Sequence, residues 1–435
     1  MDIARGLIGV LFLVAVSWLL SSNRKAIDWP LVIKGILLQV ILALMILKIP
    51  FVETIFDYIS KAFVKVISFT DFGSDFLFRQ FSDGTVSTGL YNFAFRILPT
   101  IVFFSALTAL LYYLKILQKV VYAFAWIMKR TLKLSGAESL SAAGNVFLGQ
   151  TEAPLLIRPY LHGMTKSEIA CMMIGGMATI AGGVLASYIN FLGGDSEASK
   201  IEFARHLLTA SIMSAPAAII CAKMLVPETE KFNEDMNIST ENIGSNALEA
   251  IANGTSDGLK LAVNVGAMLL VFTAFIYMGN WILGDIIGHY TGLNSVIAEN
   301  TVYDKLSMQF ILGYVGAPIA WLVGVSSTDM IAVGQLIGEK TILNEFYAYV
   351  TLGNMKNAEL GPEGGLGVFH EAKSVYIATY ILCGFSNFAS IGIQIGGIGS
   401  LMPSRKGLLS KLGITALIGG TLACLFTAAI AGMFL

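Results

Sequence analysis

Two carboxylates lie within apolar stretches of the sequence, each close to amide side chains. Glu152 belongs to the run Gly149-Gln-Thr-Glu-Ala-Pro154, and Glu345 directly follows Asn344. An ionised side chain at mid-bilayer costs about 2.5–3.5 kcal/mol even on the most lenient scale, so it persists only beside a partner or a water-filled cavity. Carboxylates accept hydrogen bonds, whereas amides both donate and accept them. We therefore expect these residues to bind a polar solute.

A purely structural role is the alternative for both carboxylates. Glu152 could pair with Arg158, and Glu345 with Lys340, only to hold helices together. Two such carboxylates in similar, interrupted apolar regions favour a functional role instead. Pro154 and Gly149 interrupt the first region, which leaves backbone groups free and lets the neighbouring side chains project into one space.

A second group of polar residues carries no charge. Its members are Asn145, Thr179, Asn387 and Ser390, each in a part of the chain rich in glycine or alanine. Unwound backbone in such segments exposes carbonyl oxygens, which are suitable ligands for a hard cation such as sodium. Hydrogen bonds between packed helices, worth well under 2 kcal/mol each, are the alternative for any one of these residues.

The composition places these residues in a membrane protein. The chain has 435 residues, of which 55% are hydrophobic and only 13% charged, and its mean hydropathy is +0.73. A soluble globule would carry roughly a quarter charged residues. The net charge of −1 and the lack of a basic run argue against a nucleic-acid partner. The four cysteines lack metal-site spacing and read as small buried hydrophobes: Cys171, Cys221, Cys383 and Cys424.

Apolar stretches of near bilayer-spanning length occur eight times. They cover residues 6–21, 30–50, 92–116, 166–192, 203–226, 258–284, 371–400 and 408–435. Two further apolar regions, 118–162 and 306–352, are interrupted in the middle, which suits re-entrant helical hairpins. Residues 51–69 alternate charged and apolar positions with helical spacing and predict an amphipathic interfacial helix. The predicted fold is an all-α polytopic membrane protein with eight transmembrane helices.

The two hairpin regions also divide the chain into related halves. Each is followed by a glycine-containing, broken span, so a hairpin, a broken helix and a helix occur twice. With the N-terminus outside, positive charge gathers in the connections assigned to the inside, for example at Arg24, Lys25, Lys129 and Arg130. This orientation requires both hairpins to return to their own side. The halves then form an inverted repeat, with the substrate site at their interface.

Three motifs resemble the concentrative nucleoside transporters. They are the run from Ala143 to Leu156 followed by Arg158-Pro-Tyr160, the pattern G-x-K-x-x-x-N-E-F-x-A-Y from Gly338 to Tyr349, and Cys383-Gly-Phe-Ser-Asn-Phe-Ala-Ser390. The second pattern is highly specific. The resemblance extends over essentially the whole chain and suits a bacterial-length, sodium-coupled member. It implies a homotrimer in a cell (inner) membrane, in which a mobile transport domain moves against a fixed scaffold as an elevator.

The resemblance also implies site residues. By the family pattern, the nucleoside base would contact Gln150, Thr151 and Glu152, and the ribose hydroxyls would contact Glu345, Asn387 and Ser390. The apolar walls would be Val184, Leu261 and Phe385. Asn145 and Thr179 would bind sodium by side chain, with the backbone oxygens of Leu148 and Ile180. No other cofactor is expected.

The predicted organisation follows from the spans and motifs. It comprises N-terminal scaffold helices and the interfacial helix (1–117), a first transport repeat (118–226), a cytoplasmic linker (227–257), a scaffold helix (258–305) and a second transport repeat (306–435). Proton coupling through Glu152 or Glu345 is the nearest alternative to sodium. An intramembrane enzyme is disfavoured because the four histidines have no catalytic spacing, and a channel because carboxylates among apolar walls suit a pocket. The preferred base and the ion stoichiometry stay open.

Overall fold

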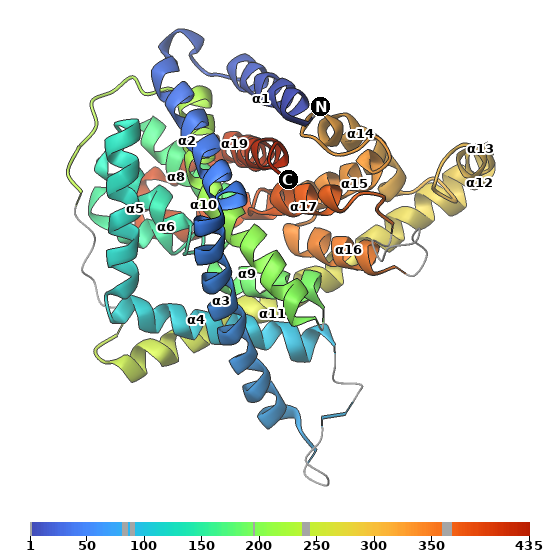
Figure 1. Ribbon diagram of the computed structural model, residues 1–435, viewed down its shortest axis with the longest axis horizontal. Helices are drawn as coiled ribbons and strands as arrows, with labels where there is room; N and C mark the ends of the chain where they lie inside the picture. Colours follow the sequence, from blue (N-terminus) through green and yellow to red (C-terminus); the bar gives the residue numbers. More distant parts are fainter. Residues whose placement is uncertain (1, 81–85, 88–91, 195, 237–243, 359–367) are drawn as a thin grey trace.

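The computed structural model describes residues 2–80, 86–87, 92–194, 196–236, 244–358 and 368–435. Every regular element in these ranges is a helix (Figure 1). Six helical stretches there are long and apolar enough to cross a membrane: 29–48, 94–113, 166–193, 197–225, 247–291 and 403–432. The all-α polytopic membrane fold is therefore confirmed. The predicted first and seventh spans contain shorter apolar helices, at 3–19 and 388–401, the latter because its span is broken.

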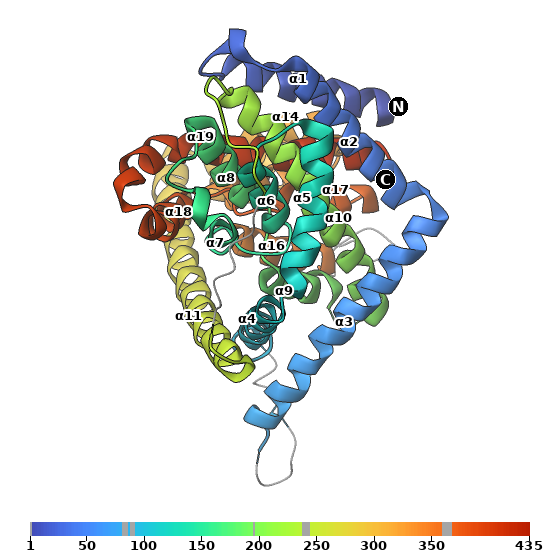
Figure 2. The same cartoon turned by 90° about the vertical axis from the view of Figure 1, so that its left-hand side faces the viewer.

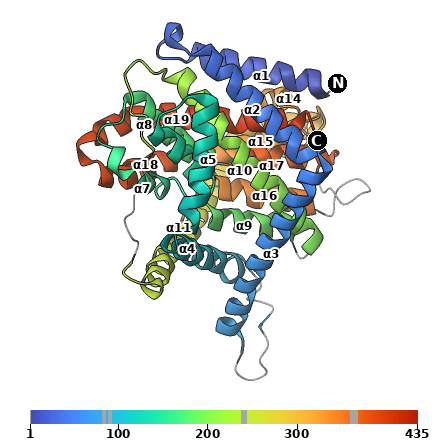
Figure 3. The ribbon, with the colours of Figure 1, turned by 60° about the vertical axis from the view of Figure 1, so that its left-hand side comes forward.

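Three helices form the N-terminal part. Helix α1 (Asp2–Leu19) lies against α14 and α19 (Figure 3), and α2 (Trp29–Lys48) packs on α10. Helix α3 (Pro50–Phe78) is the predicted interfacial helix, but it is longer than the expected 51–69. Its buried side is a stripe of small or slender residues that contacts α10, including Ser60, Val64 and Ser74. On the same helix, Glu53 and Asp57 accept bonds from Arg205 at 2.6 and 3.3 Å.

Helices α4 and α11 form a closely packed pair. A π-helical turn (Phe93–Ile97) leads into α4 (Leu98–Tyr113), and α11 (Ala247–Asn280) continues through η5 (Trp281–Gly288), α12 (His289–Thr291) and α13 (Leu293–Asn300). Glycines 254 and 258 on α11 lie directly against α4, since a Cβ at either would come within 2.6–2.8 Å of Ala109, Ser105 or Val102. Small residues at this spacing let helix backbones approach closely. Figure 2 shows α11 and α3 on opposite sides of the central body.

The first repeat begins with a helix that was predicted to be half of a hairpin. Helix α5 (Ile116–Leu132) is amphipathic, and its buried stripe includes Leu117, Val121 and Met128. Lys133 adopts a left-handed conformation (φ 54°), and Ser135 then starts a new helix with a capping box. Hairpin 1 proper is therefore α6 (Gly136–Asn145) and α7 (Ala153–Leu156), extended by η4 (Arg158–Tyr160). The interruption read from the sequence corresponds in part to the junction between α5 and α6.

The broken helix of this repeat follows hairpin 1. It consists of α8 (Lys166–Ala178) and α9 (Gly182–Gly193), and α10 (Glu197–Leu225) completes the repeat. Thr179 ends α8 in an extended conformation, and the next helix starts only at Gly182. The last carbonyl groups of α8 are thus released from helical hydrogen bonding, as helix ends require.

The second repeat has the same order of elements. Helix α14 (Met308–Leu322) precedes hairpin 2, which is α15 (Met330–Ile342) and α16 (Glu345–Asn357). The broken helix is α17 (Ala372–Leu382) and α18 (Phe388–Leu401), and η6 (Pro403–Arg405) leads into α19 (Lys406–Gly432). As in the first repeat, the predicted region 306–352 contains a separate helix before the hairpin. The hairpin tip is residues 343–344, not the middle of that region.

The two broken helices meet at their breaks. Gly384 lies between α17 and α18 with φ +146°, and a Cβ there would be 2.8 Å from the carbonyl oxygens of both Met177 and Ala178 at the end of α8. Only glycine combines this backbone conformation with so close an approach. Both interruptions therefore lie in the buried centre of the protein.

The predicted cytoplasmic linker is shorter in the structure. Residues 227–236 form no helix, and residues 237–243 lie outside the described ranges. Helix α11 begins at Ala247, whereas the predicted span begins at 258. Asn246 starts it early because its side chain accepts a hydrogen bond from the Glu249 amide, which is a favourable N-cap.

Candidate functional site

The tip of hairpin 1 is an irregular segment between Asn145 and Ala153. Glu152 folds back over it and accepts a hydrogen bond from the Gly149 amide at 3.0 Å. Pro154 lies in the first turn of α7, where its missing N–H breaks no helical hydrogen bond. Gln150 is buried (7% exposed), and its Nε2 donates to Ser390 Oγ at 3.2 Å, whereas its Oε1 has no partner among the described residues. The tip thus presents a carboxylate and an amide with spare acceptor capacity.

The opposite side of the site comes from the second repeat. Asn344 and Asn387 cap α16 and α18, accepting bonds from the amides of Tyr347 (2.8 Å) and Ser390 (2.9 Å). Each cap fixes where its helix begins, α16 at the tip of hairpin 2 and α18 at the break after α17. Glu345, the first residue of α16, is only 4% exposed.

Glu345 is held by two neutral donors. Its Oε2 accepts from Asn387 Nδ2 at 2.7 Å, and its Oε1 accepts from the Tyr188 hydroxyl at 3.2 Å. Tyr188 is itself fixed by stacking on Tyr349, with ring centroids 4.0 Å apart. Lys340, the alternative partner, instead donates to the carbonyl of Ile381 at 2.8 Å. The hydrogen bonds of Glu345 therefore hold it at the site and leave some of its lone pairs free.

These groups line one cavity of about 250 Å³, which we call the central cavity. All nine residues named for the substrate lie on it: Gln150, Thr151, Glu152, Val184, Leu261, Glu345, Phe385, Asn387 and Ser390. They come from hairpin 1, α9, α11, hairpin 2 and the broken helix of the second repeat. The structure thus brings the whole set together, as expected of a site at the interface of two repeats.

The sequence motifs missed part of this cavity. Asn264, Val265 and Met268 of α11 also line it. Asn264 follows Leu261 by one turn of the same helix, and Tyr188 follows Val184 in the same way on α9, so helical spacing could have identified both. The polar Asn264 in particular stands within an apolar helix.

The four residues named for sodium lie at or beside the break between α8 and α9. Asn145 ends α6 and is 1% exposed, yet neither its Oδ1 nor its Nδ2 has a hydrogen-bond partner in the part of the chain that the structure describes. Its amide lies against Gly175, since a Cβ there would be 2.9 Å from Nδ2, and Thr179 Oγ1 donates to the carbonyl of Gly175 at 2.9 Å. Among the described residues, no donor is bonded to the carbonyl oxygens of Leu148 or Ile180. A set of neutral, unsatisfied oxygens fits a small hard cation.

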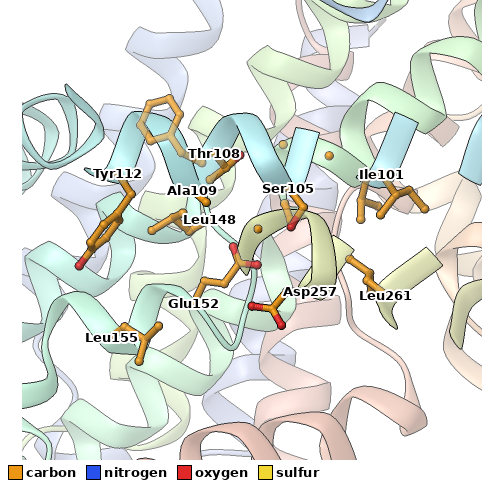
Figure 4. A pocket seen from close by; sticks show the side chains of 16 residues that line it. Ile101, Ser105, Thr108, Ala109, Tyr112, Leu148, Glu152, Leu155, Asp257 and Leu261 are labelled. Carbon is orange, nitrogen blue, oxygen red and sulfur yellow. The ribbon is translucent and has the colours of Figure 1, made fainter. Parts of the chain in front are cut away.

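A second cavity adjoins the central one. It measures about 160 Å³ and lies between α4, α11 and hairpin 1, with Glu152, Val184 and Leu261 lining both cavities. Figure 4 shows the carboxylates of Glu152 and Asp257 facing each other beneath Ser105 of α4. Glu152 therefore lies at the boundary between the central cavity and the α4–α11 pair.

Comparison with known proteins extends over the whole chain. Residues 206–432 match the family described as the C-terminus of Na+ dependent nucleoside transporters, residues 8–81 match its N-terminus, and residues 94–195 match a nucleoside recognition gate. An uncharacterized transporter of Haemophilus influenzae is 38% identical over 100% of this chain and 98% of its own. Solute carrier family 28 member 3 of Rattus norvegicus is 40% identical over 98% of this chain and 58% of its own.

Solved structures give the same picture. CNTnw in an inward-facing substrate-bound state is 37% identical, with a TM-score of 0.88 over 100% of this chain and 98% of its own. A doubly substituted form of CNTnw in an outward-facing state has a TM-score of 0.86 at 36% identity, again over 100% of this chain and 98% of its own. These relatives are transporters, not enzymes.

Proposed function

The chain belongs to the concentrative family of Na+ dependent nucleoside transporters, and we propose that it imports nucleosides into the cell with sodium, by an elevator-type movement of its two repeats. Sodium is accordingly the coupling ion, and the chain is a membrane protein. The inner cell membrane is its proposed location. The proposed division is that of the sequence, except that the linker ends where α11 begins. It comprises scaffold segments 1–117 and 247–305, a linker at 227–246, and transport repeats 118–226 and 306–435.

The central cavity carries this proposal. We assign Glu345, Asn387 and Ser390 to the ribose hydroxyls, because a carboxylate can accept from both members of a diol. Gln150, Thr151 and Glu152 would contact the base, whose edges combine donors and acceptors. Val184, Leu261 and Phe385 would pack against the flat faces of the nucleoside. The unsatisfied Oε1 of Gln150 supports this assignment, since buried polar atoms are usually bonded.

The sodium assignment has separate support. Asn145, Thr179, Leu148 and Ile180 surround the end of a half-helix, where the negative pole of the helix favours a cation. An unpaired buried amide such as Asn145 is costly, and an ion bound to its oxygen would remove that cost. A proton needs no such set of oxygens, so these residues favour sodium over proton coupling.

An elevator movement suits the packing. The tight α4–α11 pair contacts the repeats mainly where α4 packs on α9, with smaller contacts to α5, α14 and α16, whereas α8, α10, α17 and α19 pack closely on one another. We propose that α4 and α11 belong to the scaffold and that α8, α10, α17 and α19 move. Large apolar side chains of α11 are exposed, including Val263 (59%), Leu270 (71%) and Phe275 (57%). Lipid would cover part of this apolar surface, and we propose that a homotrimer covers the rest.

Transport into liposomes tests the proposal. We expect uridine and adenosine to accumulate against their gradients when sodium is outside, and accumulation to stop when choline replaces sodium. Saturable uptake that persists in choline but follows a proton gradient would replace sodium with a proton. Uptake that never exceeds equilibrium would refute secondary active transport.

A further inference from the structure

Lys340 is a buried cation in hairpin 2 that forms no ion pair with the described residues. Its side chain is 2% exposed, and its Nζ donates to the carbonyl of Ile381 at 2.8 Å and contacts Cys424 Sγ at 3.2 Å. No carboxylate of a described residue lies within 4.0 Å of this ammonium group. A charge placed so deep in a membrane protein requires a compensating environment.

The nearest compensation comes from the end of the half-helix α17, and the carboxylate of Glu345 adds to it at longer range. Ile381 is its penultimate residue, and the carbonyls of a last helical turn lack helical partners and carry partial negative charge. Neighbouring carbonyls are also occupied: the Tyr349 hydroxyl donates to Thr379 at 2.8 Å, and Cys424 Sγ donates to Cys383 at 3.0 Å. The carbonyl end of α17 is thus satisfied by the protein's own donors, one of them a cation.

The first repeat has the same geometry but no cation of its own. There the C-terminus of half-helix α8 faces hairpin 1, as the C-terminus of α17 faces hairpin 2. Where hairpin 2 supplies the Lys340 ammonium, hairpin 1 supplies the Asn145 amide, whose two polar atoms are both without partners. The carbonyls of Leu148 and Ile180 likewise accept no hydrogen bond from the described residues. Carbonyl groups at the end of α8 also accept bonds from the protein, that of Gly175 from Thr179 Oγ1 at 2.9 Å and that of Ala178 from Cys424 Sγ at 3.7 Å, but neither donor is charged. Within the described residues, the second repeat therefore has a cationic donor at this position and the first has only neutral ones.

We propose that Lys340 is a tethered cation that takes, in the second repeat, the place sodium takes in the first. It positions the break between α17 and α18, and through it Asn387 and Glu345, without consuming an ion. The coupling ratio is then one sodium ion per nucleoside. This inference rests on the proposed sodium symport.

Lys340→Gln tests it, because glutamine removes the charge but supplies an amide oxygen, as Asn145 does. We would measure ²²Na and labelled uridine fluxes into the same liposomes, together with the melting temperature of the purified protein against sodium concentration. Wild type should give about one sodium per uridine, and the variant about two, with a steeper dependence on sodium since each site adds to the apparent Hill coefficient. The variant should also lose more stability in choline than in saturating sodium.

Lys356→Gln is the matched control. Lys356 Nζ also donates to a helix-end carbonyl, that of Leu192 at 3.0 Å, but away from the two breaks. Its flux ratio should stay at the wild-type value. A variant Lys340→Gln that is folded and keeps the wild-type ratio and sodium dependence would overturn the tethered-cation role. If that variant does not fold, the wild-type ratio alone decides, because about two sodium ions per uridine is incompatible with a filled second position. Absence of any sodium flux would instead refute the symport itself.

Discussion

The Glu345→Gln substitution tests the proposed ribose site most directly. In the structure each carboxylate oxygen accepts one bond, from Asn387 and from Tyr188. A carboxylate offers about four lone-pair sites, so roughly two remain for a diol. Glutamine is close in shape but neutral, and its NH₂ group would face a donor if it pointed at Asn387.

The magnitude follows from the loss of charge. A hydrogen bond to a charged group contributes about 1.5–3 kcal/mol and one between neutral groups about 0.5–1.5, so each ribose hydroxyl loses about 1–1.5 kcal/mol. Two hydroxyls lose about 2–3 kcal/mol, which is roughly a 30- to 150-fold weaker apparent affinity for uridine.

Competition for uridine uptake in liposomes measures this loss. 2′,3′-Dideoxyuridine lacks both hydroxyls, so it should bind wild type weakly and be little affected by the substitution, as a double-mutant cycle requires. Glu339→Gln is the matched control, since Glu339 is equally buried on hairpin 2 but is bonded to Gln335 away from the central cavity. Equal losses for uridine and its dideoxy analogue would show that Glu345 does not act through the ribose.

Three further changes address the ion, the fold and the base. Asn145→Ala should raise the half-saturating sodium concentration for uptake by roughly tenfold to a hundredfold, because it removes one polar contact to a charged group. Unchanged sodium activation would show that Asn145 is not part of the sodium site. Gly384→Ala should lower the melting temperature, at a cost of about 1–3 kcal/mol or more from its left-handed backbone and close carbonyls. Gly392→Ala, inside α18 with open space around it, should leave the melting temperature unchanged or raise it. Gly149→Ser should weaken adenosine about 10-fold or more and uridine far less, because Gly149 lines the cavity and its backbone does not require glycine. Parallel losses for both nucleosides would argue against a role in base selectivity.

The local sequence contained most of what identifies the site. Glu152 and Glu345 stood out because each is a charged residue beside amides in an interrupted apolar region. Burying a charge in lipid costs free energy, so such residues are rare unless they have a function. Glycine and proline marked the broken helices for an equally local reason, since they act on their own backbone. The motifs around these residues then predicted the family, which the comparisons confirmed.

Boundaries inside the interrupted regions needed more than hydropathy. Helix α5 is apolar on one side and α14 is apolar along nearly its whole length, so hydropathy did not separate either from the hairpin that follows it. Only the left-handed turn at Lys133 and the cap at Ser135 separate α5 from α6, and such turns leave little trace in composition.

The tertiary structure decided which polar groups are satisfied. The sequence left an ion pair between Lys340 and Glu345 as the alternative to a binding role for Glu345. In the structure the lysine instead donates to the carbonyl of Ile381 at the end of α17, and Glu345 accepts from Asn387. It also leaves Asn145 without a partner beside the end of α8. Hydrogen-bond partners distant in sequence depend on how the two breaks cross at Gly384, and that crossing exists only once both repeats have packed together.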